Sequence, residues 1–199
     1  MVQPLIRLAT ADDAPAIAEI YRPIVESTPI SFETVAPDAD EMRRRIENIL
    51  GSHPWLVCER DGVVAGYVYA SKHRERAAYR WSVDTSVYVD DRFRRRRIGH
   101  ALYLSLFAVL SAQGYANAFA GITLPSPASV GLHEHVGFTP VGVYRRVGYK
   151  LGAWHDVGWW QRSLERPEEE PSSIRGLSEV QQRNEFGALL AAGLAVIRD

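Results

Sequence analysis

The chain has 199 residues, of which 46% are hydrophobic, a formal net charge of −1 and a single cysteine, Cys58. This length can bury one substantial core with a small appendage, the near-neutral charge argues against a nucleic-acid-binding protein with its usual basic excess, and one cysteine excludes an intrachain disulfide. Because the sequence has no basic-then-apolar leader and no apolar run of membrane-spanning length, we expect a cytoplasmic protein that binds neither membrane nor nucleic acid.

Hydrophobic periodicity and turn signals predict alternating strands and helices along most of the chain. Thr10–Asp13 resembles a capping box at a helix start, and Asp61-Gly62 is typical of a hairpin turn. In chain order we expect a strand at Leu5–Leu8, a helix carrying Ile17 to Ile24, a loop at Pro29–Pro37, a helix at Asp38–Leu50, strands at Trp55–Arg60 and Val63–Ala70, a polar loop at Ser71–Arg80, a strand at Trp81–Val89, a helix ending at Gln113-Gly114, a strand at Ala116–Leu124, a short helix at Pro125–His135, and closing strands at Pro140–Val147 and Ala153–Ser163. This order predicts a mixed α/β (α+β) fold with a largely antiparallel sheet.

The composition changes after Leu164, which divides the chain into a domain over residues 1–164 and a tail over residues 165–199. Glu165–Pro171 is acidic and contains prolines, as in a solvated linker. Apolar residues then recur over Leu177–Ile197 on roughly one face of a helix. We expect this amphipathic helix to dock on the body or on a partner subunit and to be dispensable for chemistry.

The segment from Arg92 to Tyr103 follows an apolar strand, contains a run of arginines and opens an amphipathic helix. A helix start offers unpaired backbone N–H groups and a partial positive charge, and arginines add contacts to phosphate oxygens. A solvated charge run, or an Arg-rich nucleic-acid or regulatory binding module, is the alternative interpretation. The position at a strand-to-helix junction favours a phosphate site.

This segment resembles the acetyl-CoA-binding motif of the GNAT superfamily of N-acetyltransferases, [Gln/Arg]-x-x-Gly-x-[Gly/Ala]. Arg94 takes its first position and Gly99 its last, while Arg97 replaces the first glycine. Further segments resemble the phosphinothricin and methionine sulfone/sulfoximine N-acetyltransferase branch, in order from about Ile6 to Leu164: Ser31–Thr34, Trp81–Val89, Ile122–Val130, His133–Phe138 and Gly148–Val157. The resemblance implies a central sheet that splays open between its fourth and fifth strands and is flanked by helices.

Acetyl-CoA is the co-substrate that the resemblance implies, and no metal is expected. Backbone groups of the strand can hold the pantetheine amides as an added strand would, while N–H groups of the basic loop take the pyrophosphate. A valine at Gly99 should therefore crowd the phosphate-facing backbone. The expected cofactor-binding residues are Val87, Tyr88, Val89, Arg94, Arg95, Arg96, Arg97, Ile98, Gly99, His100, Ser126 and Ser129.

Two residues are candidates for the general base that removes a proton from the acceptor amine. Asp84 is an acid in an otherwise apolar strand, and the resembled family has a glutamate there as a proposed base. Because aspartate is shorter, an intervening water is expected. His133 matches a histidine that the family retains, and imidazole has a pKa suited to proton transfer near pH 7. The sequence leaves this choice open.

The resemblance also implies an acceptor pocket and an assembly. Phe32, Arg76, Tyr79 and Asp84 match positions that line the substrate pocket of the family, and Arg76 could bind a carboxylate or phosphinate. A homodimer is expected, with Trp154, Trp159 and Trp160 available for a buried interface. The predicted function is direct acetyl transfer from acetyl-CoA to the α-amino group of a small amino-acid analogue such as phosphinothricin, methionine sulfone or methionine sulfoximine. Acetylation of another small amine is the alternative within this class.

Overall fold

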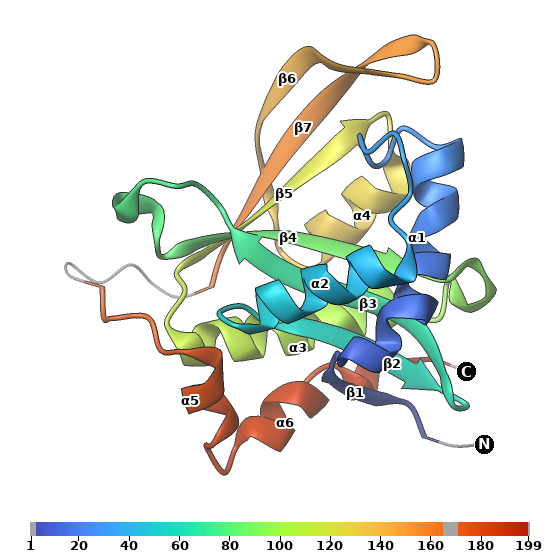
Figure 1. Cartoon of the computed structure of the whole chain (residues 1–199). Coiled ribbons are helices and arrows are strands. Elements are labelled where there is room, and N and C mark those ends of the chain that lie inside the picture. The colour runs from blue at the N-terminus through green and yellow to red at the C-terminus, as the bar shows by residue number, and fades with distance from the viewer. Residues whose placement is uncertain (1–2, 165–170, 199) are drawn as a thin grey trace.

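The computed structural model describes residues 3–164 and 171–198 and shows one seven-stranded sheet with helices on both faces (Figure 1). The strands lie in the order β1-β2-β3-β4-β5-β7-β6. Their bounds are Leu5–Leu8 (β1), Trp55–Arg60 (β2), Val63–Lys72 (β3), Ser82–Val89 (β4), Asn117–Leu124 (β5), Thr139–Lys150 (β6) and Ala153–Ser163 (β7). The helices are Ala14–Ser27 (α1), Ala39–Leu50 (α2), Ile98–Gln113 (α3), Pro127–His135 (α4), Leu177–Gln181 (α5) and Phe186–Ala191 (α6), with 3-10 turns at Ala11–Asp13, Ala77–Tyr79, Asp91–Phe93 and Leu194–Val196.

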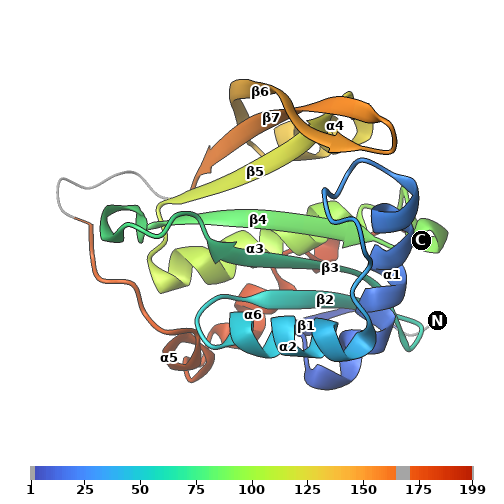
Figure 2. The same ribbon diagram turned by 45° about the horizontal axis from the view of Figure 1, so that its top comes forward.

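Two hydrophobic clusters hold the helices to the sheet. Helices α1 and α2 cover one face, and α3 covers the other with α6 beside it (Figure 2). On the α1–α2 face, Ile17 and Ile46 are fully buried against Trp55 and Tyr67. On the α3 face, the core is built around Leu102, Leu106 and Leu110, all fully buried. In the described ranges, no helix has the length and apolarity required to cross a bilayer.

Strands β4 and β5 form the feature of the sheet that positions the site. They are the parallel neighbours in an otherwise antiparallel sheet, and they pair only at Ser82–Asn117, Val83–Ala118 and Asp84–Phe119. Beyond Asp84 the two strands diverge, and β5 rises away from β4 together with β7 and β6 (Figures 1 and 2). The predicted splay between the fourth and fifth strands is confirmed.

Both hairpins close through two-residue turns whose residues have positive φ. Asp61 and Gly62 (φ 52° and 80°) join β2 to β3, as the sequence predicted, and Leu151 and Gly152 (φ 52° and 79°) join β6 to β7. Such turns match the twist of the strands they connect. Strand β6 therefore extends through Lys150, three residues past its predicted end at Val147, and only two of the five residues between the predicted strands form the turn.

The tail also differs from its prediction as a single amphipathic helix. It forms α5, α6 and a 3-10 turn, which pack along α3. The break before the 3-10 turn contains Gly193, where a Cβ atom would collide with the backbone of Ala101. The buried Ser105 hydroxyl donates to Leu190 O (2.7 Å) and accepts from Gly193 N–H (3.1 Å), so α3 fixes the bend. The predicted linker at Glu165–Pro171 lies largely outside the described residues.

Candidate active site

A cleft opens between β4 and β5 where the strands stop pairing. Its walls are Thr85–Tyr88 on β4 and Gly121–Thr123 on β5, with Ile30, Ser126, Ser129 and His133 around them. The edge of β4 beyond Asp84 has no β5 partner, so its backbone groups are available to an extended ligand. Val87 and Tyr88, two of the residues expected to bind the cofactor, lie on this wall, whereas Val89 lies beyond the cleft and faces α3.

The basic loop leads from this wall to the start of α3. Ala101 N–H makes the first hydrogen bond of the helix, to Arg97 O (2.9 Å), so the amides of Ile98, Gly99 and His100 have no acceptor within the helix. Arg95 and Arg97 have positive φ (64° and 61°), and this conformation curls the preceding backbone into an anion-binding concavity. Unpaired amides within a cluster of arginines fit a pyrophosphate.

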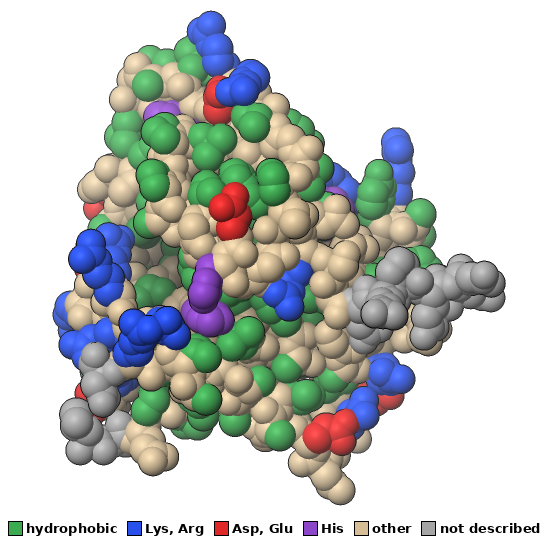
Figure 3. Space-filling view, turned by 180° about the vertical axis from the view of Figure 1, so that it is seen from behind, with side chains coloured by type: hydrophobic (Ala, Val, Ile, Leu, Met, Phe, Trp, Pro, Cys, Tyr) green, Lys and Arg blue, Asp and Glu red, His purple; other side chains and the backbone are tan. Residues whose placement is uncertain are grey.

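Not every arginine of the loop is free to meet a phosphate. Arg94 forms an ion pair with Asp91 (2.7 Å), and Arg96 O accepts a hydrogen bond from Arg198 N–H (3.0 Å). Arg95 and Arg97 are exposed. Figure 3 shows Lys and Arg side chains gathered at one edge of the α3 side of the molecule. The Arg96 contact involves only its backbone, so the side-chain charges that no described acid pairs are those of the exposed Arg95 and Arg97 and the partly buried Arg96.

Gly99 has a packing role that the motif does not reveal. A Cβ atom there would lie 3.0 Å from Leu132 Cδ2 and 3.6 Å from Val89 Cγ2. The missing side chain thus makes room for α4 and β4 rather than for the phosphate. The expectation that a larger residue crowds the phosphate-facing backbone is wrong.

Asp84 is the last residue of β4 that pairs with β5, so it lies at the end of the cleft where these two strands meet. Because side chains alternate along a strand, it shares a face with Ser86 and Tyr88 of the cleft wall. His73 Nδ1 lies 2.7 Å from Asp84 Oδ1, and Arg74 Nη1 lies 3.8 Å from Oδ2. Burial raises the pKa of Asp84, and His73 and Arg74 oppose this rise. The carboxylate is a stronger base than an exposed aspartate.

His133 lies on the α3 side of the cleft, and both of its ring nitrogens form hydrogen bonds with other residues of the chain. Ser129 O, which can only accept, lies 2.7 Å from Nδ1, and the Tyr103 hydroxyl lies 2.8 Å from Nε2. Nδ1 therefore carries the proton, and Nε2 accepts from Tyr103. Burial lowers the pKa of His133. This neutral imidazole has no nitrogen left for an acceptor amine.

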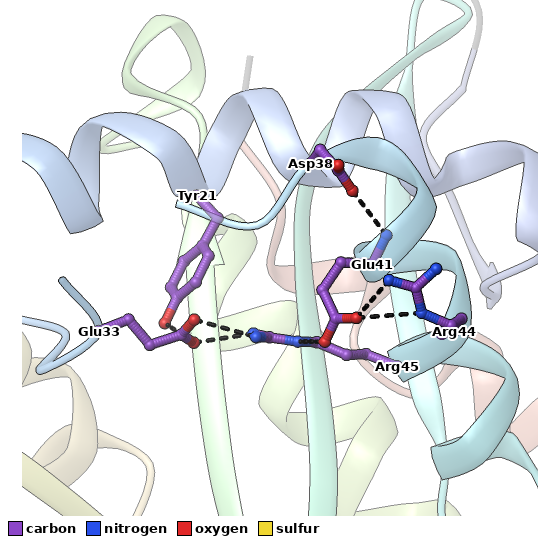
Figure 4. A network of polar contacts seen from close by, with 6 residues as sticks. All are labelled: Tyr21, Glu33, Asp38, Glu41, Arg44 and Arg45. Atoms are coloured by element: carbon purple, nitrogen blue, oxygen red, sulfur yellow. Dashed lines mark hydrogen bonds and ion pairs between the residues drawn. The ribbon is translucent and has the colours of Figure 1, made fainter. Parts of the chain in front are cut away.

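A polar network anchors the loop that follows α1. Glu33 accepts two hydrogen bonds from Arg45 (2.8 and 3.0 Å) and one from the Tyr21 hydroxyl (2.9 Å), and Arg45 also donates to Glu41 (2.9 Å), as Figure 4 shows. Although burial acts to raise it, the pKa of Glu33 is lowered by Arg45 and Tyr21. The Tyr21 ring also meets Tyr88 of the cleft wall at 5.0 Å. The network thus connects the loop between α1 and α2 to the cleft.

Phe32, on the same loop, packs against the β6–β7 hairpin. Its ring occupies the space that a side chain at Gly148 would need. Nearby, the buried Lys150 ammonium donates to Val25 O (2.5 Å) and Ser31 O (2.6 Å) and so fastens β6 to α1 and the loop. Sequence reasoning missed Lys150, because nothing near it in the chain indicates that its partners are backbone carbonyls.

The remaining acceptor-side candidates belong to the loop between β3 and β4. The Tyr79 ring meets the His73 ring edge-on at 5.9 Å, which places Tyr79 next to the partner of Asp84. Arg76 O accepts a hydrogen bond from Tyr79 N–H (3.0 Å), while the side chain of Arg76 is exposed and, among the described residues, forms no ion pair with another candidate. Arg74, two residues earlier, is the arginine that approaches Asp84. In the same described ranges, no group of three or more His, Cys, Asp or Glu residues is placed to hold a metal.

Comparisons with known proteins agree with this geometry. Residues 6–159 match the family model of the acetyltransferase (GNAT) domain. The chain is 41% identical over 175 residues to a phosphinothricin N-acetyltransferase of Streptomyces viridochromogenes, covering 88% of this chain and 95% of that protein. It is 33% identical over 162 residues to an L-methionine sulfoximine/L-methionine sulfone acetyltransferase of Salmonella typhimurium, covering 80% and 94%. A solved phosphinothricin acetyltransferase from Sinorhizobium meliloti, in complex with acetyl-CoA, superposes with a TM-score of 0.80 at 33% identity and covers 88% of this chain and 99% of that chain.

Proposed function

Because this chain belongs to the GNAT family of acetyltransferases and is an N-acetyltransferase, we propose that it acetylates the α-amino group of a small amino-acid analogue by direct transfer from acetyl-CoA. Phosphinothricin, methionine sulfone and methionine sulfoximine are the acceptors that its relatives' names support. The position of Asp84 at the fork of β4 and β5 is the observation that carries the proposal. A carboxylate there stands at the closed end of the cleft in which a thioester would lie.

In this reaction, the amine nitrogen forms a bond to the acetyl carbonyl carbon while the carbon–sulfur bond of the thioester breaks. An α-amino group has an ordinary pKa of about 8, so most of it is protonated at neutral pH. Asp84 takes the first ammonium proton through a water, and the second proton, which the nitrogen loses as the amide forms, passes through solvent to the released thiolate. The raised pKa of Asp84 makes its carboxylate a better proton acceptor for this step.

The cleft and the basic loop would divide the binding of acetyl-CoA between them. The β4 edge at Val87 pairs with the pantetheine arm, and the amides of Ile98, Gly99 and His100 bind the pyrophosphate together with Arg95 and Arg97. Ser126 and Ser129 lie on the α4 side of the cleft, where their hydroxyl groups can reach the arm.

The acceptor would enter from the α1–α2 face, on which Asp84 and Tyr88 lie. Phe32 and Tyr79 form apolar walls, and the arginines of the β3–β4 loop, Arg74 and Arg76, attract the acid groups of an amino-acid analogue. With this arrangement, a small zwitterion would suit the site better than an amine without acid groups.

We also propose a cytoplasmic homodimer that uses the β6–β7 hairpin. Large apolar side chains on it are exposed, including Val141 (59%), Tyr149 (61%) and Trp154 (54%). Trp160 is buried in the core of its own chain, so Trp154 is the tryptophan that an interface would cover. An exposed apolar patch of this kind is typical of a subunit contact, and sedimentation analysis of Trp154→Glu would test it by conversion to monomer.

A thiol-release assay with acetyl-CoA tests the proposed activity. Purified protein is incubated with phosphinothricin, methionine sulfone or methionine sulfoximine, and the α-keto analogue of each compound serves as a control that lacks the amine. We expect thiol release with the amines only, and acetyl on the α-nitrogen by mass spectrometry. Thiol release only with amines unrelated to these three compounds would favour the alternative function, acetylation of another small amine. Salt-sensitive DNA retention without thiol release would favour a binding module.

A further inference from the structure

His73 is a largely buried side chain next to the proposed base. It follows the end of β3, and its side chain is only 10% exposed. The imidazole stacks on the ring of Phe119 at 4.3 Å with an interplanar angle of 13°. Phe119 is the residue that pairs with Asp84 across the β4–β5 seam. The histidine, its ring partner and the carboxylate therefore meet at the closed end of the cleft.

The geometry divides the two oxygens of Asp84 between different neighbours. Oδ1 lies 2.7 Å from His73 Nδ1, whereas Oδ2 has Arg74 Nη1 at 3.8 Å, beyond hydrogen-bond distance. The Arg74 guanidinium lies over the Trp159 ring at 5.5 Å. Because a carboxylate can only accept, His73 Nδ1 carries the proton of this hydrogen bond. Oδ2 is left as the oxygen that can receive a proton.

Aromatic side chains make up most of the surroundings of the contact between His73 and Asp84. The rings around His73 are Phe119 from β5, Trp159 from β7 and Tyr79 from the loop before β4. Arg74 is the one charged residue besides Asp84 for which the described part of the chain shows a contact in this group. The aromatic rings pack around the imidazole of His73 and so restrict its orientation toward Asp84.

We propose that His73 is a positioning residue for acetyl transfer, whose Nδ1–H holds the Asp84 carboxylate at the fork with Oδ2 directed to the acceptor proton and sets the pH range in which that carboxylate works. The inference rests on the proposed role of Asp84 as the base. It assigns to the β3–β4 loop a part in catalysis besides lining the acceptor pocket.

The hydrogen bond has a measurable consequence for the ionisation of Asp84. Burial raises the pKa of this carboxyl, and the hydrogen bond from His73 is the largest effect that lowers it. Without the donor, Asp84 would hold its proton up to a higher pH. The acid limb of kcat/KM for the amine should then move to higher pH, because the protonated acid cannot act as base.

Two substitutions separate this role from packing. His73→Phe keeps an aromatic ring on Phe119 and removes the donor, whereas His73→Asn keeps an N–H near the position of Nδ1 and removes the ring. We expect His73→Phe to move the acid limb up by about one pH unit and to lower kcat/KM on that limb about tenfold. His73→Asn should keep the limb within a few tenths of a unit of wild type. The KM for acetyl-CoA should change little in both variants.

An unchanged acid limb in His73→Phe, or equal shifts in both variants, would overturn the proposal. A measurement on the wild-type protein covers the case in which His73→Phe does not fold. Nitrogen-15 NMR of the histidine rings should show His73 protonated at Nδ1 at neutral pH, and a ring protonated at Nε2 alone would refute the hydrogen bond. If Asp84→Asn is nearly normal, the base assignment itself fails. If Asp84→Asn is severely impaired while His73→Phe has the wild-type profile, only the role of His73 fails.

Discussion

The side chains of Asp84 and His133 lie on opposite faces of strand β4. Asp84 points to the α1–α2 face, which Tyr88 shares, whereas His133 is bonded to Tyr103 of α3, whose hydroxyl lies 3.4 Å from Thr85 Oγ1. An acceptor amine that approaches Asp84 from the α1–α2 face therefore meets His133 only across the cleft. The two candidate bases are alternatives rather than partners, and the occupied nitrogens of His133 favour Asp84.

Replacement of Asp84 by Asn should lower kcat/KM for the amine by about ten- to a thousandfold, the range for loss of a general base. The affinity for acetyl-CoA should stay nearly constant, because Asp84 lies near the start of β4, whereas the basic loop follows the end of that strand. Asp84→Glu should keep more activity than Asp84→Asn. Steady-state kinetics with both substrates varied would measure this, and a nearly normal Asp84→Asn beside a severely impaired His133→Ala would transfer the role to His133.

His133 should contribute to the pH dependence of stability. Burial lowers its pKa in the folded protein, so below about pH 6.5 the unfolded chain binds a proton that the folded chain does not. The free energy of unfolding should therefore fall as the pH drops below that value. Urea unfolding at pH 7.5 and pH 5 should show a smaller fall for His133→Gln than for wild type. His53 and His100, whose pKa values burial also lowers, would account for part of the fall that remains.

Gly99→Val should destabilise the fold by about 1 to 3 kcal/mol, the usual effect of overpacking. The added side chain meets Leu132 and Val89, which hold α4 and β4 against α3. Arg95→Glu is the matched variant in the same loop, and it should weaken acetyl-CoA binding in a salt-dependent way without loss of stability. Thermal unfolding and calorimetry would compare the two, and a fully stable Gly99→Val protein would contradict the packing role.

Arg97→Gly should stabilise the protein. Arg97 has φ 61° and ψ 18°, a conformation that costs a residue with a side chain about 1 to 2 kcal/mol, while the added freedom of glycine in the unfolded chain offsets roughly 0.5 to 1 kcal/mol of the gain. Arg96 is the control, because it has no positive φ. Denaturant unfolding should show Arg97→Gly above wild type and Arg96→Gly below it, and the reverse order would refute the strain.

The tail should affect acetyl-CoA binding, contrary to the expectation that it is dispensable. Its last described residue donates from Arg198 N–H to Arg96 O (3.0 Å), and Arg60 donates to Arg198 O (2.7 Å). A chain ending at Val196 should raise the KM for acetyl-CoA severalfold and keep most of its stability. A chain ending at Leu164 should also unfold more easily, because α3 loses the buried Leu177 and Val180. An unchanged KM in both truncations would restore the original expectation.

The sequence was sufficient for the features that depend on local pattern. The strand, basic loop and helix around Arg94 and Gly99 have the predicted order, and Asp84 occurs where the resemblance places an acid. His73 was missed because its contact with Asp84 depends on the register of β3 and β4, which pairs Ser71 with Asp84 across a charged loop. The same holds for Tyr103 and His133, which are 30 residues apart and meet only after α3 and α4 pack.

Contacts between the walls of the cleft close it at both ends. The β4–β5 seam closes one end at Asp84, and Thr123 Oγ1 reaches across the other end to Ile30 O (3.4 Å), beside the contacts of Lys150. Because the fold already holds both ends of the cleft, a ligand does not have to order its walls. We therefore expect the protein to lose little conformational entropy on binding. The distance between the two ends is set by the fold, so we expect the cleft to select the length of the ligand segment that lies along it.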